Sequence, residues 1–329
     1  MTSAVRSAPD EAGAPWSPDE LARRLRAVGE ARYHNHHPFN QRMHRGELSR
    51  AELQRWVANR YCYQQAIPIK DGAILSNCPE LAVRRSWIQR IVDHDGHEGS
   101  EGGLEAWLRL AEAMGVSRDV LLSGRWVLPG VRFAVDAYIR FCRSRPWLEA
   151  VAASLTELFA PTIVTERLSA ILTHYKWIEP DGLQYFRNRL TQAPRDAEYA
   201  LGLVLERCQT REWQDRAVAA LNFKCDVLWS LLDAVEQGHI PDGVMTPRVA
   251  AKAGLQWDGV RNRHILLYPE GLVALNPTAA EIVGLCDGRR TVDEIVTVLS
   301  SKYESPEITT DVQTVLATLA AKGLVTYDA

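Results

Sequence analysis

The first 240 residues carry apolar side chains mainly at helical spacing. After Ser49, the apolar residues Leu53, Trp56 and Val57 stand three and four positions apart, which places them on one face of a helix. Ser49 and Glu52 form the S-x-x-E pattern of a capping box, a signal for a helix start. The pattern therefore predicts a helix that begins directly after Ser49.

The same signals recur along this part of the chain. Ser17, Pro18 and Glu20 mark the start of the first helix, and Gly238 marks the end of the last one. Further helices are expected at about 80–94, 101–115, 130–145, 147–174, 180–190, 194–209 and 211–237. Strand patterns are nearly absent before residue 240, so this part is expected to be all-α.

The pattern changes after residue 245. The segments "LQWD", "HILLYP", "GLVAL" and "LVTY" read as short strands. Between them we expect a helix capped by Asn276, a second with the capping box Thr291 and Glu294, and a third at about 309–322. This order of elements predicts a small α+β domain of the winged-helix-like kind.

Charge argues against nucleic acid as the partner of this small domain. Residues 246–329 contain eight Lys and Arg against ten Asp and Glu, a net charge of −2. A winged helix that binds DNA needs a basic face for the phosphates. We therefore expect it to bind a protein or peptide.

Composition indicates a soluble protein of a reducing compartment. The 329 residues are 46% hydrophobic, and the net charge is −3. The six cysteines form no C-x-x-C pair, the start of the chain lacks a signal sequence, and we find no uninterrupted apolar run of about 20 residues. We predict a flexible tail at 1–16, an all-α domain at 17–238, a linker at 239–250 and the small domain at 251–329.

Three histidines at 34, 36 and 37 raise the question of a metal site. No carboxylate accompanies them on one helical face, and His37 precedes Pro38, which disfavours a helix at that point. The single Glu-x-x-His pair, Glu236 and His239, extends past a helix end. The chain also lacks a dinucleotide fingerprint and a Walker A sequence. We expect neither a metal nor a nucleotide.

Several cations lie in segments that otherwise read as core-forming helix. They are Arg60, Lys70, Arg167, Arg189 and Lys224. Buried cations are costly without anionic partners, so they indicate either structural ion pairs or a cavity for a multiply charged anion. Tyr63, Tyr138 and Tyr185 would pack near such a cavity, and Glu157 stands in an apolar stretch as a candidate acid or base. The residues alone leave both alternatives open.

Longer motifs resemble a known family. The segments "RYHNHHPFNQRMHRGELSRAELQRWVANRYCYQQAIPIKDGAILSNCP", "RRSWIQRIVDHDG", "SLTELFAP" and "YFRNRLTQAPRDAEYAL" resemble PqqC, the oxidase that completes the synthesis of pyrroloquinoline quinone (PQQ). This resemblance covers about residues 17–237. Residues 246–329, with "RHILLYPEGLVALNPTAAEIVGLCDGRRTVDEIV", are similar to PqqD of the same pathway.

The resemblance implies a haem-oxygenase-like helical fold that works as a homodimer without metal, haem or flavin. The implied reaction closes a ring in a tricyclic precursor and oxidises it with O2, giving PQQ and hydrogen peroxide. PQQ carries three carboxylates, which would give the interior cations an anionic partner. The PqqD-like part would bind the precursor peptide PqqA and present it to the radical enzyme PqqE. All of this implies a cytoplasmic protein that uses no membrane and no nucleic acid.

The resemblance also assigns roles to residues. His94 would be the general base, Glu157 a second acid–base group, and Tyr185, Arg189 and Lys224 would shape the O2 site. His34 would line the pocket. The residues that would hold carboxylates and quinone oxygens are Arg60, Gln64, Lys70, Tyr138 and Arg167.

Three positions depart from the family pattern. Val164, Tyr199 and Asn40 each replace a histidine of the family pattern. Loss of an acid–base histidine at 164 would slow a proton transfer by about 10²–10⁴-fold. Two other functions therefore compete with the oxidase: a catalytically impaired protein that binds PQQ or its precursor, and a thiaminase-like hydrolase with a cysteine nucleophile in the cavity.

Overall fold

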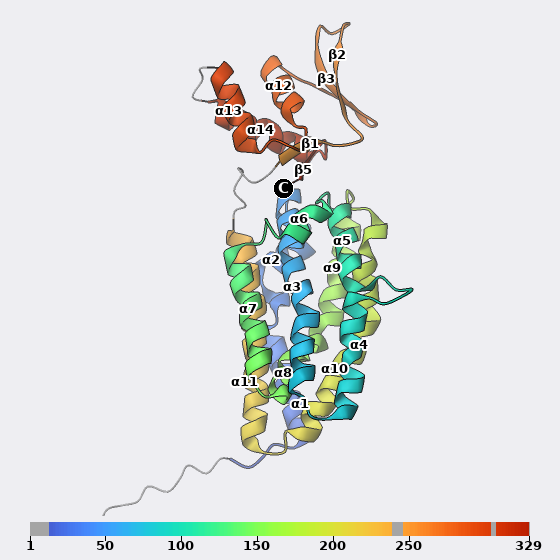
Figure 1. Cartoon of the computed structure of the whole chain (residues 1–329), viewed down its shortest axis with the longest axis vertical. Coiled ribbons are helices and arrows are strands. Elements are labelled where there is room, and N and C mark those ends of the chain that lie inside the picture. The colour runs from blue at the N-terminus through green and yellow to red at the C-terminus, as the bar shows by residue number, and fades with distance from the viewer. Residues whose placement is uncertain (1–12, 239–245, 304–306, 329) are drawn as a thin grey trace, which may run out of the picture.

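The computed structural model describes residues 13–238, 246–303 and 307–328, and it consists of a helical bundle with a small domain at one end (Figure 1). Residues 1–12 of the predicted tail and 239–245 of the predicted linker, with His239, lie outside the described residues. The helices of the bundle are α1 (Pro18–Arg32), η1 (His34–His36), α2 (Pro38–His44), α3 (Arg50–Asn77), α4 (Leu81–Asp95), α5 (Gly102–Ala113), α6 (Arg118–Ser123), α7 (Pro129–Ser144), α8 (Trp147–Ala153), η2 (Ser154–Phe159), α9 (Ala160–His174), η3 (Pro180–Leu183), α10 (Gln184–Arg207) and α11 (Arg211–Gln237).

Helix α3 is the central element of the bundle, and its start is the one predicted from the capping box. The Ser49 side chain accepts a hydrogen bond from the backbone N–H of Glu52, and the Glu52 carboxylate accepts one from Ser49. The helix packs against α4, α5 and α7. Leu53, Trp56 and Val57 are fully buried, which confirms the helical face predicted from their spacing.

Two predicted helix boundaries were wrong. The predicted break between residues 190 and 194 does not exist, because α10 continues through Pro194 while it packs against α8, α9 and η2. The single helix predicted at 147–174 is interrupted by the 3₁₀ segment η2. Gly29 of α1 lies against this segment, and a Cβ atom there would stand 1.9 Å from the Phe159 ring. The glycine thus allows α1 to approach the segment that carries Glu157.

The small domain has a second hydrophobic core. Its elements are β1 (Thr246–Val249), β2 (Gly254–Asp258), β3 (Arg263–Tyr268), β4 (Gly271–Ala274), α12 (Pro277–Leu285), α13 (Val292–Lys302), α14 (Ile308–Ala321) and β5 (Val325–Asp328). Strands β2, β3 and β4 form an antiparallel sheet, and β1 pairs with β5 in a separate one. The predicted strands, and the capping box of Thr291 and Glu294, are confirmed. Strand β1 was not predicted, and it falls in the range assigned to the linker.

The small domain contacts the bundle through its last strand. Tyr327 packs against both hydrophobic cores, and its backbone forms a β-bridge with Val116 in the segment between α5 and α6. The strand pair β1–β5 therefore lies at the end of the bundle where α3 begins (Figure 1).

One described stretch has the length and apolar character of a membrane-spanning helix. It is Trp147–His174, and 61% of its most apolar window is buried inside the bundle. Buried core helices pass the same test, and η2 interrupts the α-helix here. The stretch is weak evidence for a membrane segment.

Candidate active site

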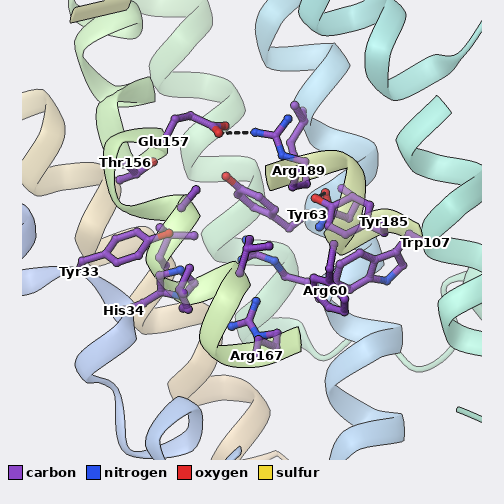
Figure 2. A pocket seen from close by; sticks show the side chains of 17 residues that line it. Tyr33, His34, Arg60, Tyr63, Trp107, Thr156, Glu157, Arg167, Tyr185 and Arg189 are labelled. Atoms are coloured by element: carbon purple, nitrogen blue, oxygen red, sulfur yellow. Dashed lines mark hydrogen bonds and ion pairs between the residues drawn. The ribbon is translucent and has the colours of Figure 1, made fainter. Parts of the chain in front are cut away.

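A cavity that is partly open to solvent lies inside the helical bundle. Figure 2 shows side chains from η1, α3, α5, η2, α9 and α10 converging on it, with Tyr33 from the junction between α1 and η1. Its lining residues are Tyr33, His34, Arg60, Tyr63, Gln64, Ile67, Trp107, Thr156, Glu157, Ala160, Ile163, Val164, Arg167, Tyr185, Phe186, Arg189 and Leu228. Aromatic rings and charged groups thus face one space, as in pockets for flat polar ligands.

Most of the predicted site residues line this cavity. These are His34, Arg60, Gln64, Glu157, Arg167, Tyr185 and Arg189. The other four, Lys70, His94, Tyr138 and Lys224, are fully buried behind the lining. The fold therefore brings the predicted site residues together in two layers, one that lines the cavity and one behind it. The roles given to these residues remain predictions.

One layer is a cluster of charged residues that neutralise one another, here called the paired cluster. It consists of three cations and three carboxylates: Lys70, Arg90, Arg189, Asp71, Glu157 and Asp196. Arg90 lies at its centre, 3.4 Å from Asp71, 3.3 Å from Glu157 and 3.2 Å from Asp196. Lys70 Nζ is 2.6 Å from Asp71 Oδ1. The formal charges of the six side chains cancel.

The paired cluster fixes the ionisation of Glu157. Burial alone would raise the pKa of this carboxyl, but the charges of Arg189 and Arg90 outweigh burial and lower the pKa to about 2. Arg189 forms an ion pair with Glu157 that Figure 2 marks with a dashed line. At neutral pH Glu157 is therefore a carboxylate on the cavity wall.

Three other cations inside the bundle, two of them buried and Arg60 half-buried, have no carboxylate partner among the described residues; we call them the unpaired cations. They are Arg60, Arg167 and Lys224. The Arg60 guanidinium lies 4.1 Å from the centre of the Tyr63 ring, and its buried Nη1 has no hydrogen-bond partner. Arg167 Nη2 donates to the side-chain oxygen of Asn40 at 2.9 Å, while its Nε is buried and unpartnered.

Lys224 is enclosed by aromatic rings. Its Nζ donates to Tyr63 Oη at 2.6 Å and lies 3.9 Å from the centre of the Tyr138 ring. Burial, with the nearby charges of Arg60 and Lys70, lowers the pKa of Lys224 well below its usual value. Burial and the charge of Arg60 also lower the pKa of Arg167, to about 10. An anion in the cavity would relieve both effects.

His94 is held as a neutral imidazole with one free lone pair. Burial first, and then the positive charge of Arg189, lowers its pKa to about 4. Its Nδ1 lies 3.2 Å from the backbone oxygen of Arg90, which can only accept, so Nδ1 carries the proton. Nε2 is therefore the basic nitrogen, and it is buried without a partner.

The three neighbouring histidines have different environments. His34 is buried and lines the cavity, while His36 is exposed. His37 is buried but structural: Nδ1 accepts from the backbone N–H of Phe39, and Nε2 lies 3.1 Å from Asp233. Among the described residues no group of three His, Cys, Asp or Glu could hold a metal ion.

Sequence reasoning missed the partners that complete the paired cluster. Asp71, Arg90 and Asp196 come from α3, α4 and α10, and all three are buried. Asp71 also accepts from Trp87 Nε1 at 2.8 Å. The run Lys70-Asp71 in an apolar helix was an available signal for a buried ion pair, whereas the contacts of Arg90 depend on the tertiary fold.

The three departures from the family pattern occupy different places. Val164 lines the cavity, and Asn40 is buried directly behind Arg167 and His34. Tyr199 lies away from the lining, with its ring 6.4 Å from that of Trp87. Two of the three substitutions therefore affect the cavity or its immediate support.

Two family models match the chain in the two regions that the fold separates. Residues 22–234 match the TENA/THI-4/PQQC family, and residues 263–325 match the family of coenzyme PQQ synthesis protein D (PqqD). The chain belongs to the TENA/THI-4/PQQC family. Its small domain matches PqqD, as the resemblance predicted.

Curated relatives agree with this family membership. A pyrroloquinoline-quinone synthase from Cronobacter sakazakii is 58% identical over 69% of this chain and 90% of the relative. A bifunctional coenzyme PQQ synthesis protein C/D from Methylorubrum extorquens is 40% identical over 95% of this chain and 96% of the relative. The second relative shares the two-part organisation along its length.

Solved structures support the fold of the TENA/THI-4/PQQC part. A domain with a haem oxygenase-like fold from Shewanella denitrificans superimposes with a TM-score of 0.53 at 16% identity, over 67% of this chain and 90% of that one. A TenA homologue from Pseudomonas syringae gives a TM-score of 0.52 at 15% identity, over 70% and 98%. The predicted haem-oxygenase-like helical fold is confirmed.

Proposed function

We propose that the helical domain is a pyrroloquinoline-quinone synthase: it closes a ring in a tricyclic precursor and oxidises the product with O2, without a metal or organic cofactor. The electrons removed from the substrate pass to O2, which becomes hydrogen peroxide, and PQQ is released. Membership of the TENA/THI-4/PQQC family and the curated synthases among the relatives support this proposal.

The observation that carries the proposal is the set of unpaired cations. Arg60 and Arg167 line a cavity with aromatic walls, Lys224 lies behind the lining, and none of the three has a carboxylate partner among the described residues. A flat ligand with three carboxylates would supply three negative charges and stack on the aromatic rings. Partial burial strengthens such charge-assisted contacts, because fewer water molecules compete for the ligand than at the surface.

The chemistry then divides between the two layers of the site. His94 offers the lone pair of Nε2 as a base, and Glu157 is a permanent carboxylate that accepts from Arg189 and Arg90. In the proposal, His94 removes a proton from the precursor, and the unpaired cations stabilise the negative charge that develops on it. The O2 site is formed by Tyr185, Arg189 and Lys224, and the Tyr185 hydroxyl donates a hydrogen bond to Gln64 at 2.9 Å. Lys70 and Tyr138 lie behind the lining and support the bound ligand.

The small domain extends this proposal to a peptide partner. Its match to PqqD supports binding of the precursor peptide PqqA and its presentation to the radical enzyme PqqE. The fusion would raise the local concentration of pathway components. We further propose that the protein works in the cytoplasm as a homodimer, with the helical bundle and the small domain as its two functional parts.

The direct test is aerobic incubation of metal-stripped full-length protein with the tricyclic precursor, following O2 uptake and PQQ absorbance. We expect O2 loss together with product formation. Absence of both, under conditions in which the Cronobacter synthase turns over, would contradict the proposal. That enzyme is the matched positive control.

A second candidate function follows from Val164. This apolar side chain lines the cavity where the family pattern has histidine. A protein that binds PQQ or its precursor without turnover would show a spectral change but no O2 uptake, and Val164→His would restore uptake. The thiaminase-like hydrolase has less support, because no cysteine is among the described lining residues and burial raises the pKa of the Cys142, Cys208 and Cys225 thiols to about 11.

A further inference from the structure

The side-chain amide of Asn40 is fixed in one orientation by two partners that cannot exchange roles. Arg167 Nη2, which can only donate, lies 2.9 Å from Asn40 Oδ1. The backbone oxygen of His34, which can only accept, lies 2.7 Å from Asn40 Nδ2. If the amide were flipped, Nδ2 would face the Arg167 donor and Oδ1 would face the His34 backbone oxygen, and neither pair could form a hydrogen bond. The Nδ2 group of Asn40 therefore faces His34.

This orientation determines which nitrogen of His34 carries the proton. Asn40 Nδ2 lies 3.4 Å from His34 Nδ1, so a lone pair on Nδ1 is the arrangement in which this amide donor meets an acceptor. His34 is also neutral: burial, followed by the charges of Arg60 and Arg167, lowers its pKa well below the usual value. The proton of the neutral ring is thus on Nε2.

The position of His34 directs this proton to the ligand. His34 lines the cavity, and in Figure 2 its ring lies next to Tyr33 and Arg167. Within the described part of the chain, Nε2 of His34 forms no hydrogen bond. His34 is also the only imidazole among the described lining residues, while Val164, which lines the same cavity, offers no polar atom. His94 has the opposite tautomer, with its free lone pair on Nε2.

From this geometry we propose that Asn40 is a positioning residue that holds His34 as the Nε2–H tautomer, and that His34 thereby donates a hydrogen bond to an oxygen of the carboxylate-rich substrate. The role assigned to His34 rests on the proposed function, whereas its tautomer does not. The two buried histidines then divide the work: His94 accepts a proton, and His34 donates to substrate oxygen. Asn40 also holds Arg167, so one amide positions two groups on the same wall.

The tautomer can be read directly from the full-length protein labelled with ¹⁵N-histidine. A long-range ¹H–¹⁵N spectrum distinguishes the two neutral tautomers from the imidazolium, and His34→Gln identifies the resonances of residue 34. We expect a neutral ring protonated on Nε2 for His34 and on Nδ1 for His94. A His34 ring protonated on Nδ1, or a cationic ring at pH 7, would overturn the proposal. The wild-type spectrum is sufficient for this test.

A substitution tests the role of Asn40 separately. In Asn40→Asp the carboxylate can only accept, so we expect His34 to become protonated on Nδ1 and PQQ affinity to fall by about tenfold because the new charge neutralises Arg167. Asn222→Asp is the matched control, since Asn222 also accepts from an arginine, Arg32, at 3.3 Å. An unchanged His34 tautomer in Asn40→Asp would overturn the proposal. If the tautomers are as expected but wild-type protein does not bind PQQ, the proposed function fails instead.

Discussion

Two groups of cations lie inside the same bundle, and their partners differ. In the paired cluster, Lys70, Arg90 and Arg189 meet Asp71, Glu157 and Asp196, so the charges cancel within the protein. The unpaired cations Arg60, Arg167 and Lys224 meet aromatic rings, an amide and a hydroxyl instead. Burial of a cation without an anion is unfavourable, so the second group costs stability in the free protein.

The difference separates what the fold requires from what the ligand requires. The paired cluster joins α3, α4, η2 and α10, so it stabilises the arrangement of these helices and holds Glu157 as a carboxylate. The unpaired cations are arranged for an anion that the protein itself does not provide. Functional sites commonly retain such unfavourable groups at the expense of stability.

The largest effect is expected when the paired cluster is broken. Glu157→Gln removes the carboxylate shared by Arg90 and Arg189 and leaves their charges buried with fewer partners. We expect the free energy of unfolding to fall by about 3–5 kcal/mol, measured by urea denaturation followed by tryptophan fluorescence. Glu80→Gln is the control, because the Glu80–Arg207 pair is screened by solvent and its loss should have a much smaller effect. Equal effects of the two substitutions would contradict the comparison.

A smaller effect is expected from His94 as the pH falls. Its pKa is lowered from 6.5 to about 4, so between these values the unfolded chain takes up a proton that the folded protein excludes. The free energy of unfolding should therefore decrease as pH falls from 6.5 to 4, with His94 contributing about 3 kcal/mol at most. We expect His94→Gln to reduce this decrease and His36→Gln, at an exposed position, to leave it unchanged. If the free energy of unfolding of His94→Gln falls with pH as steeply as that of the wild type, the lowered pKa assigned to His94 is contradicted.

The smallest effect on stability is expected from an unpaired cation. Lys224→Met removes a buried amino group that has no carboxylate partner among the described residues, so we expect the free energy of unfolding to rise by about 1 kcal/mol. The lowered pKa of Lys224 means that the folded protein binds fewer protons than the unfolded chain at alkaline pH. Stability of the wild type should thus increase with pH towards 10.5, and Lys224→Met should flatten this rise. Lys176→Met, at an exposed lysine, is the control, and a loss of stability in Lys224→Met alone would contradict the account.

Local sequence signals were sufficient for most of the fold. The capping boxes at Ser49 and Thr291 marked helix starts that the structure has at the same residues. The segment around Pro194 shows the limit of such rules: separate helices were predicted at 180–190 and 194–209, but packing of α10 against α8, α9 and η2 keeps one helix continuous through this proline.

The candidate site was predictable as a list but not as an arrangement. Apolar helical surroundings and family motifs identified Arg60, Arg167 and Arg189, yet only the tertiary contacts distinguish the arginine with carboxylate partners from the two without them. Arg90 and Asp196 are 106 positions apart in the sequence and 3.2 Å apart in the fold. No local pattern carries that information, because the contact exists only after α4 and α10 have packed.

The central claim is that the unpaired cations hold a ligand rich in carboxylates, and Arg60→Met tests it most directly. PQQ binding to the full-length wild type and to this variant would be measured by titration calorimetry, beside urea denaturation of both. We predict an affinity about 30-fold lower in the variant, with an unchanged or higher free energy of unfolding. Unchanged affinity, or a loss of stability as large as that of Glu157→Gln, would contradict the account.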